Sequence, residues 1–187
     1  MKICIDPGHS GPVEPGCCSG GATEAATVLQ ISKIIATMLE GAGHEVLLTR
    51  IDDVNDDLLM WRVNKASAFG ADIFVSIHCN GFKDPAAHGT EVWYYPGSKI
   101  GELLADCIQQ ALIANCQTAD RGIKTNDEWT VLKHTDCPAV LVELAFISND
   151  KEREMLTDNL LQRQFAVGVC NGIMKFAQGG PLFGGAV

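Results

Sequence analysis

Short apolar runs of the kind found in β-strands alternate along this chain with longer stretches that have helical spacing. The runs lie at 2–5, 44–49, 71–77, 90–95 and 139–144. Between them, apolar residues recur every three or four positions, which is typical of amphipathic helices. The third and the last of these runs are apolar almost throughout. This favours central parallel strands that are buried on both faces.

Turn and capping residues mark several of the boundaries. The Asp-Pro-Gly sequence at 6–8 ends the first strand, since these residues favour turns. Asn55 is a good N-cap for a second helix, and the Ser-Asn-Asp sequence at 148–150 would cap one long final helix. We also expect a short strand at 129–132.

Strands that alternate with helices predict an α/β layer fold. We expect a mostly parallel mixed sheet of about six strands, sandwiched by helices, in a single domain over residues 1–177. No internal repeat is visible. Residues 178–187 are rich in glycine and are expected to form a tail or the start of a linker.

Composition and charge exclude several classes of partner. The 187 residues include 14 Lys and Arg against 23 Asp and Glu, which gives a formal charge of −9. Nucleic-acid binders show the opposite balance, so no nucleic-acid partner is expected. No apolar run approaches the ~18 residues that a membrane span requires, so no membrane partner is expected either.

The eight cysteines contain no C-x-x-C pair, which argues against a zinc ribbon or a thioredoxin-type motif. Cys4, Cys79, Cys107 and Cys170 lie within apolar patterns, where a free thiol behaves as a small buried hydrophobe. We therefore expect reduced cysteines. A structural zinc or disulfide frame is the alternative, which a titration of free thiols would test.

Polar residues that can do chemistry follow the apolar strands. His9 comes after the first strand, His78 ends the strand at 71–77, and Glu143 ends the apolar part of the run at 139–144. Because the carboxyl ends of parallel strands meet at one edge of a sheet, these side chains should lie together. Glu24 opens the first helix, after a Gly-rich loop that begins at His9, and can fold back beside that histidine.

Two imidazoles and one carboxylate, with a fourth position left to water, form a standard catalytic zinc set. Each residue alone also has an ordinary structural explanation; Glu24, for example, stabilises the helix dipole. Glu143 is harder to explain in this way, because a carboxylate within an apolar run needs a partner. His44, His88 and His134 lack a comparable context. From the residues alone, a zinc hydrolase and a purely structural explanation both stay open.

Four segments together resemble the zinc-dependent N-acetylmuramoyl-L-alanine amidases in their single-domain catalytic form. They are DPGHSG at 6–11, Glu24 at the head of the first helix, ADIFVSIHCN at 71–80 and PAVLVELAFISN at 138–149. The resemblance runs in unbroken order from residue 1 to about 177. The loop at 11–21 is richer in Cys and Gly than in many relatives, and this departure concerns fine specificity rather than the reaction.

The resemblance implies one Zn²⁺ per chain, held by His9, Glu24 and His78, with Glu143 as the general base and then the general acid. Asn80 is a candidate substrate contact, although a role in a turn is equally consistent with its position. The substrate would be bacterial peptidoglycan, cut at the amide between N-acetylmuramic acid and L-alanine. The alternatives are a zinc peptidase that acts within the stem peptide and a non-catalytic wall-binding module.

The resemblance also implies action at the cell wall. The first ten residues do not read as a signal peptide. Two explanations fit: a phage or prophage endolysin that is made in the cytoplasm and then released, or a catalytic domain excised from a longer autolysin. In the second case, a separate wall-binding module is expected in the native chain.

Overall fold

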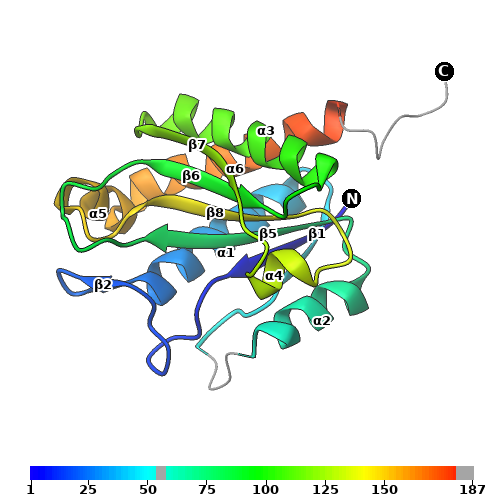
Figure 1. Ribbon diagram of the computed structural model, residues 1–187, viewed down its shortest axis with the longest axis horizontal. Coiled ribbons are helices and arrows are strands. Elements are labelled where there is room, and N and C mark those ends of the chain that lie inside the picture. The colour runs from blue at the N-terminus through cyan, green and yellow to red at the C-terminus, as the bar shows by residue number, and fades with distance from the viewer. Residues whose placement is uncertain (54–57, 180–187) are drawn as a thin grey trace.

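A six-stranded sheet with the order β4-β1-β5-β8-β6-β7 forms the centre of the molecule (Figure 1). The computed structural model describes residues 1–53 and 58–179. β6 runs antiparallel to β8, and the other neighbouring strands are parallel. The predicted mostly parallel mixed sheet is therefore confirmed. Its strands are β1 (Lys2–Pro7), β4 (Glu45–Leu48), β5 (Ile73–Asn80), β6 (Thr90–Tyr94), β7 (Asp120–Thr125) and β8 (Ala139–Phe146).

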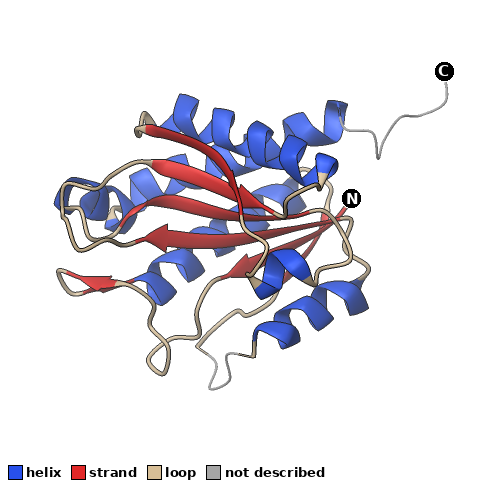
Figure 2. Cartoon of the chain, in the orientation of Figure 1, coloured by secondary structure: helices blue, strands red, loops and turns tan. Residues whose placement is uncertain are grey.

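Helices cover both faces of this sheet (Figure 2). Figure 1 shows α2 and α4 together on one side, while α1 and α6 cross behind the strands. A small hairpin of β2 (Cys18–Ser19) and β3 (Ala22–Thr23) precedes α1. None of the helices in the described ranges is long and apolar enough to cross a membrane. These helices are α1 (Glu24–Gly41), α2 (Leu59–Phe69), α3 (Lys99–Cys116), α4 (Thr130–Lys133), α5 (Asp150–Thr157) and α6 (Asn159–Gly179).

Alternate side chains of β5 enter two different cores, as its apolar sequence predicts. Ile73, Val75 and Ile77 are fully buried and pack in the large cluster that includes α1, α3 and α6. Phe74 points the other way, into a smaller cluster that contains Leu132 of α4 and Ala66 of α2. Burial of each such side chain stabilises the fold by roughly 1.5–3 kcal/mol. The strand that carries His78 is thus fixed from both sides.

The expected strand at 129–132 is wrong, because the chain forms the single helical turn α4 there. The backbone N–H of Lys133 donates to the carbonyl of Trp129 at 2.9 Å. Val131 and Leu132 still bury their side chains, so one helical turn satisfies the same apolar pattern. β7 was not expected, since its sequence DRGIKT is polar and it forms the half-exposed edge of the sheet.

The expected single helix after 148–150 is two helices, with a break at Asp158. The backbone of Asp158 is extended, and its carboxylate caps α6 by accepting from the N–H groups of Leu160 and Leu161 at 2.9 and 3.0 Å. Asn149 caps α5, in agreement with the capping prediction. The predicted cap Asn55 lies outside the described residues, and α2 begins at Leu59.

All eight cysteines are free thiols. Five of them are buried, namely Cys4, Cys79, Cys107, Cys116 and Cys170. This arrangement agrees with the expectation of reduced cysteines that fill apolar space.

Candidate metal centre

His9 occupies a strained position just beyond β1. Its φ of 61° lies in the left-handed region, which costs a non-glycine residue on the order of 1–3 kcal/mol. Two buried arginines hold this turn through its carbonyl oxygens. Arg62 donates to the carbonyls of Pro7 and His9, and Arg50 donates to that of Gly8 at 2.7 Å. Hydrogen bonds from the protein's own side chains therefore support the shape of this turn.

The carboxylate of Asp6 holds the guanidinium group of Arg62 in place. This carboxylate receives hydrogen bonds from Arg62 at 2.7 Å, from Thr49 at 2.5 Å and from Ser76 at 2.7 Å. Burial alone would raise the pKa of Asp6, but the Arg62 charge and these donors outweigh it and lower the pKa below its usual value. The ionised Asp6 thus ties the end of β1 to its neighbouring strands.

Glu24 reaches the centre from the first turn of α1. Thr23 caps that helix by accepting from the N–H of Ala26, and an acidic residue suits the positive end of the helix dipole. The buried carboxylate of Glu24 accepts from the N–H groups of Cys17 and Cys79, both at 2.9 Å. Two backbone anchors therefore fix the direction in which its oxygens point.

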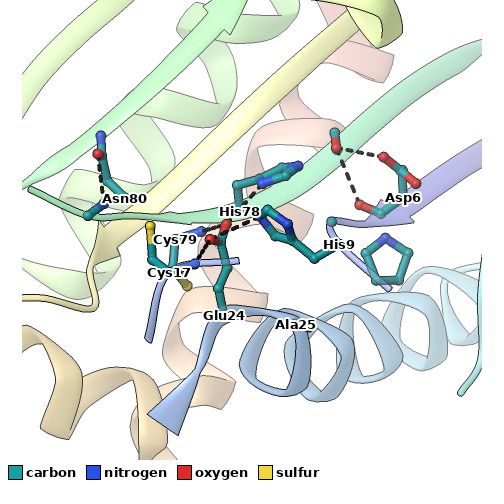
Figure 3. Close-up of polar contacts among 12 residues, drawn as sticks. Asp6, His9, Cys17, Glu24, Ala25, His78, Cys79 and Asn80 are labelled. Carbon is teal, nitrogen blue, oxygen red and sulfur yellow. Dashed lines mark hydrogen bonds and ion pairs between the residues drawn. The ribbon is translucent and has the colours of Figure 1, made fainter. Parts of the chain in front are cut away.

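Both predicted histidines face this carboxylate (Figure 3). His9 Nε2 lies 3.0 Å from one Glu24 oxygen, and His78 Nδ1 lies 2.9 Å from the other. Burial would raise the pKa of Glu24, but the hydrogen bonds and charges of His78 and His9 outweigh it and lower the pKa. Glu24 is therefore ionised at neutral pH.

The donor atoms fit a single metal ion. One atom each from His9, Glu24 and His78 can be chosen so that all three lie within 4.8 Å of one another. The two imidazole rings meet edge to face, with centroids 5.0 Å apart. Two nitrogen donors and one carboxylate oxygen are a common ligand set of catalytic zinc. The residues present therefore suit zinc.

Glu143 lies inside β8 rather than at a strand end, because β8 continues to Phe146. It still reaches the same edge, since it is the register partner of His78 on β5. Its Oε2 is buried and has no hydrogen-bond partner within the described part of the chain. Burial, and then the charges of Glu24 and Glu91, raise the pKa of Glu143 well above its usual value against the opposing effect of Lys124.

One cleft of about 380 Å³ is lined by the three candidate ligands, His9, Glu24 and His78, and by Glu143. The carboxyl group of Glu143 and the three candidate ligands therefore share a single space. Leu59, Trp129, Val131 and Leu141 contribute apolar side chains to its wall. A molecule bound here would meet the candidate metal ligands and the Glu143 carboxyl group together.

Glycines allow the backbone to approach the centre closely. A Cβ on Gly8 would lie 2.3 Å from Cε1 of His78, and one on Gly16 would lie 2.6 Å from Glu24 Oε2 and from the His9 ring. Gly16 also has a φ of +68°. Any side chain at these positions would push a candidate ligand away.

Asn80 also lines the cleft, but both ends of its side-chain amide have partners in the protein. Its Nδ2 donates to Glu91 at 3.1 Å, and its Oδ1 accepts from the N–H of Gly81 at 2.9 Å. These contacts favour the role in a turn. The substrate contact stays a prediction.

Sequence reasoning missed Glu91, which is buried beside the cleft. It accepts from Arg121 at 2.6 Å and from Lys124 at 2.5 Å, and it is the register partner of Glu143. Burial would raise the pKa of Glu91, but these two cations outweigh it and lower the pKa. The signal that could have revealed Glu91 is the RGIK segment, which puts two cations on the next strand.

Sequence reasoning also missed Glu14, in the loop after His9. Its Oε2 makes a short hydrogen bond with Nδ1 of His9. Burial would lower the pKa of His9, but Glu24 and then Glu14 outweigh it and raise the pKa. A carboxylate five residues beyond a candidate ligand was the available signal.

Comparisons with known proteins identify the family of this chain. The profile of the N-acetylmuramoyl-L-alanine amidase family matches residues 3–175. The chain is 36% identical to the amidase LytC of Bacillus subtilis over 177 residues, which are 93% of this chain but 35% of LytC. The chain thus spans about a third of that relative.

Two solved structures have the same fold. An N-acetylmuramoyl-L-alanine amidase from Clostridium difficile 630 superposes with a TM-score of 0.90 at 31% identity. The superposition covers 96% of this chain and 97% of the other. AmiC2 of Nostoc punctiforme gives a TM-score of 0.88 at 32% identity, with 95% and 97% covered. The chain belongs to the N-acetylmuramoyl-L-alanine amidase family.

Proposed function

We propose that this chain hydrolyses the amide between N-acetylmuramic acid and the L-alanine of the stem peptide in bacterial peptidoglycan, and that it does so with one bound Zn²⁺. One observation carries the proposal. The candidate ligand set of His9, Glu24 and His78 shares a cleft with Glu143, whose buried carboxylate oxygen has no partner among the described residues. A purely structural glutamate would be paired, since an unsatisfied buried group costs about 1–3 kcal/mol or more.

His9, Glu24 and His78 would hold the zinc ion. When bound at three protein ligands, zinc polarises a carbonyl oxygen and lowers the pKa of a bound water toward about 7. The protein prepares this site in advance, because Glu24 is anchored by two backbone N–H groups and His9 by the arginine-held turn. Little reorganisation is needed when the ion binds.

Glu143 would move the protons of the reaction. Its raised pKa brings the carboxyl group closer to neutral pH, where proton exchange is most effective. Its carboxylate takes the proton of the attacking water and then delivers it to the departing alanine nitrogen. Because Glu143 and His78 are register partners, the proton carrier and one ligand keep a fixed relation.

The bond that is cut follows from the family and from the names of its members. LytC and the superposed structures are N-acetylmuramoyl-L-alanine amidases by name. The formal charge of −9 gives no attraction to phosphate-bearing wall polymers. Tight attachment to the wall would therefore come from the cleft or from a separate wall-binding module in a longer chain. Both an endolysin and an autolysin fit this description.

Digestion of purified peptidoglycan, followed by mass spectrometry, tests the proposal. We expect new N-terminal L-alanine on released stem peptides and intact glycan strands. New D-amino-acid ends would instead identify a peptidase of the stem peptide. Binding to the wall without any release, by the zinc-loaded protein, would identify a non-catalytic module. Glu143→Gln is the matched control, since it should bind zinc without releasing peptides.

A further inference from the structure

Glu14 lies on the opposite side of the His9 ring from the candidate metal position. His9 Nε2 faces Glu24 at 3.0 Å, while Nδ1 makes the short hydrogen bond with Glu14 Oε2. The two ring nitrogens therefore face two different carboxylates. Glu24 is the candidate ligand, and Glu14 lies outside the group of possible ligands.

The loop backbone holds Glu14 in this place. The N–H of Ser10 donates to the carbonyl of Glu14 at 3.1 Å, and the N–H of Ala25 donates to that of Pro15 at 3.0 Å. The first bond closes the loop onto the residue beside His9, and the second ties it to the start of α1. Proline at 15 further limits the loop, because its ring fixes φ. The carboxylate is thus presented to the ring by a constrained segment.

We propose that Glu14 is a positioning residue for the metal centre: it accepts the Nδ1–H of His9 and so leaves Nε2 free to bind the ion. The inference rests on the proposed metal site. A neutral imidazole carries one N–H, and the group that binds this N–H decides which nitrogen has the free lone pair. Histidine ligands of zinc commonly donate the other N–H to a carboxylate, and loss of that partner typically weakens metal binding ~10–100-fold.

Close packing on a glycine restricts both imidazole rings. A Cβ on Gly8 would lie 2.3–2.7 Å from three ring atoms of His78, and one on Gly16 would lie 2.6 Å from the ring of His9. Packing limits the orientation of a ring, but it does not decide which of the two nitrogens carries the proton. At His9, the carboxylate of Glu14 on Nδ1 supplies that choice.

Metal affinity provides the first test. Zinc dissociation constants of the wild type, Glu14→Ala and Glu14→Gln would be measured by competition with a chromophoric chelator. We expect Glu14→Ala to bind zinc about 10–100-fold more weakly. Glu14→Gln should lose less, because its amide oxygen can accept the same hydrogen bond. Val13→Ala is the matched control in the same loop, since Val13 is 67% exposed.

The tautomer of His9 provides a second test that needs neither metal nor activity. In the metal-free protein above the titration of His9, Glu14 and Glu24 compete for the single proton of the neutral ring. ¹⁵N NMR should therefore show a wild-type population with the proton on Nδ1, and in Glu14→Ala this population should fall in favour of Nε2, which faces Glu24. Circular dichroism would establish that each variant is folded. If Glu14→Ala is not, Glu14→Leu replaces it, because leucine has no acceptor for the Nδ1–H of His9.

Two results would overturn the inference. One is a zinc dissociation constant of Glu14→Ala within twofold of the wild type. The other is an unchanged His9 tautomer in that variant. If the wild type bound no zinc, the proposed metal site would fail, whereas the tautomer measurement would still decide the role of Glu14. The two proposals can therefore fail separately.

Discussion

His78 and Glu143 are direct register partners on the adjacent parallel strands β5 and β8. Their side chains therefore emerge on the same face of the sheet, and the hydrogen-bonded ladder between the strands fixes their separation. His9 and Glu24 come instead from a loop and a helix start, and they need the buried arginines and backbone N–H groups described above. The centre thus combines a rigid half with a half that local contacts must hold.

Replacing Glu143 with Gln should remove activity and stabilise the metal-free protein. A general acid–base residue contributes on the order of 10²–10⁴-fold in rate, so turnover should fall by at least that factor. Stability at pH 7 should rise, because the amide removes a buried charge that Glu24 and Glu91 repel; each unit of a raised pKa corresponds to about 1.4 kcal/mol. Urea unfolding of the chelator-treated proteins would measure this gain.

The pH dependence of that gain has a definite sign. The pKa of Glu143 is raised in the folded state, so below its ordinary value of about 4.3 the carboxyl is protonated in both states. As the pH rises through the folded pKa, the ionised carboxylate increasingly opposes folding. The advantage of Glu143→Gln should therefore be small near pH 4 and grow toward neutrality. An equal advantage at both pH values would contradict this assignment.

Gly16→Ala should disable the centre, whereas Gly21→Ala should not. Both glycines have positive φ, so both substitutions strain the backbone similarly. At Gly16 the new methyl group would lie 2.6 Å from Glu24 and from His9. At Gly21 it would meet no other atom of the described residues within 4 Å, its chain neighbours aside. Zinc titration of the two variants separates the effects. Similar zinc affinities in both would show that the loop can relax away from the ligands.

Asp6→Asn should destabilise the protein most at neutral pH. Breaking a buried ion pair by removing one partner costs about 3–5 kcal/mol. The pKa of Asp6 is lowered in the folded state, so its contribution is fully present above the unfolded value of about 3.9 and is lost as the pH falls through the folded pKa. Wild type and variant should therefore converge in stability toward pH 2, as followed by urea unfolding at several pH values.

Zinc should stabilise the folded protein without changing its secondary structure. A ligand present at 100 times its dissociation constant adds about 2.7 kcal/mol, and this should appear as a higher melting temperature with an unchanged circular dichroism spectrum. Magnesium should give little effect, because it prefers six oxygen ligands. His78→Ala is the control, and a zinc-dependent shift of equal size in that variant would place the ion elsewhere.

The sheet and the two candidate histidine ligands were accessible from sequence through local signals, whereas Glu24 was assigned as a ligand mainly by the family resemblance. The β5 segment is apolar on both faces, and His78 follows it directly. The errors arose where the local signal is ambiguous. Trp129–Leu132 is too short for its periodicity to separate a strand from a helical turn, and Asp158 interrupts a continuous apolar stripe because its side chain caps α6.

Glu14 and Glu91 were missed for a different reason: their sequence signals do not show which residues they contact. Each is recognised only by the residues that it contacts in the folded protein. Glu91 gains its meaning from Arg121 and Lys124 on the neighbouring strand, some thirty residues later. Glu14 gains its meaning only when the loop folds onto His9. The positions of strand ends can reveal candidate metal ligands in a sequence. The residues that hydrogen-bond to those ligands can be identified only in the folded structure.

Gly8 and Gly16 are positions at which this protein does not tolerate redesign. At these two positions the backbone lies directly against the candidate ligands and leaves no room for a side chain. Libraries that target them would mostly yield proteins without a metal centre. Variation at the apolar wall, at Leu59 and Trp129, leaves the candidate ligands untouched while it reshapes the space in which the proposed substrate would bind. New wall-type preferences should therefore be sought along that wall.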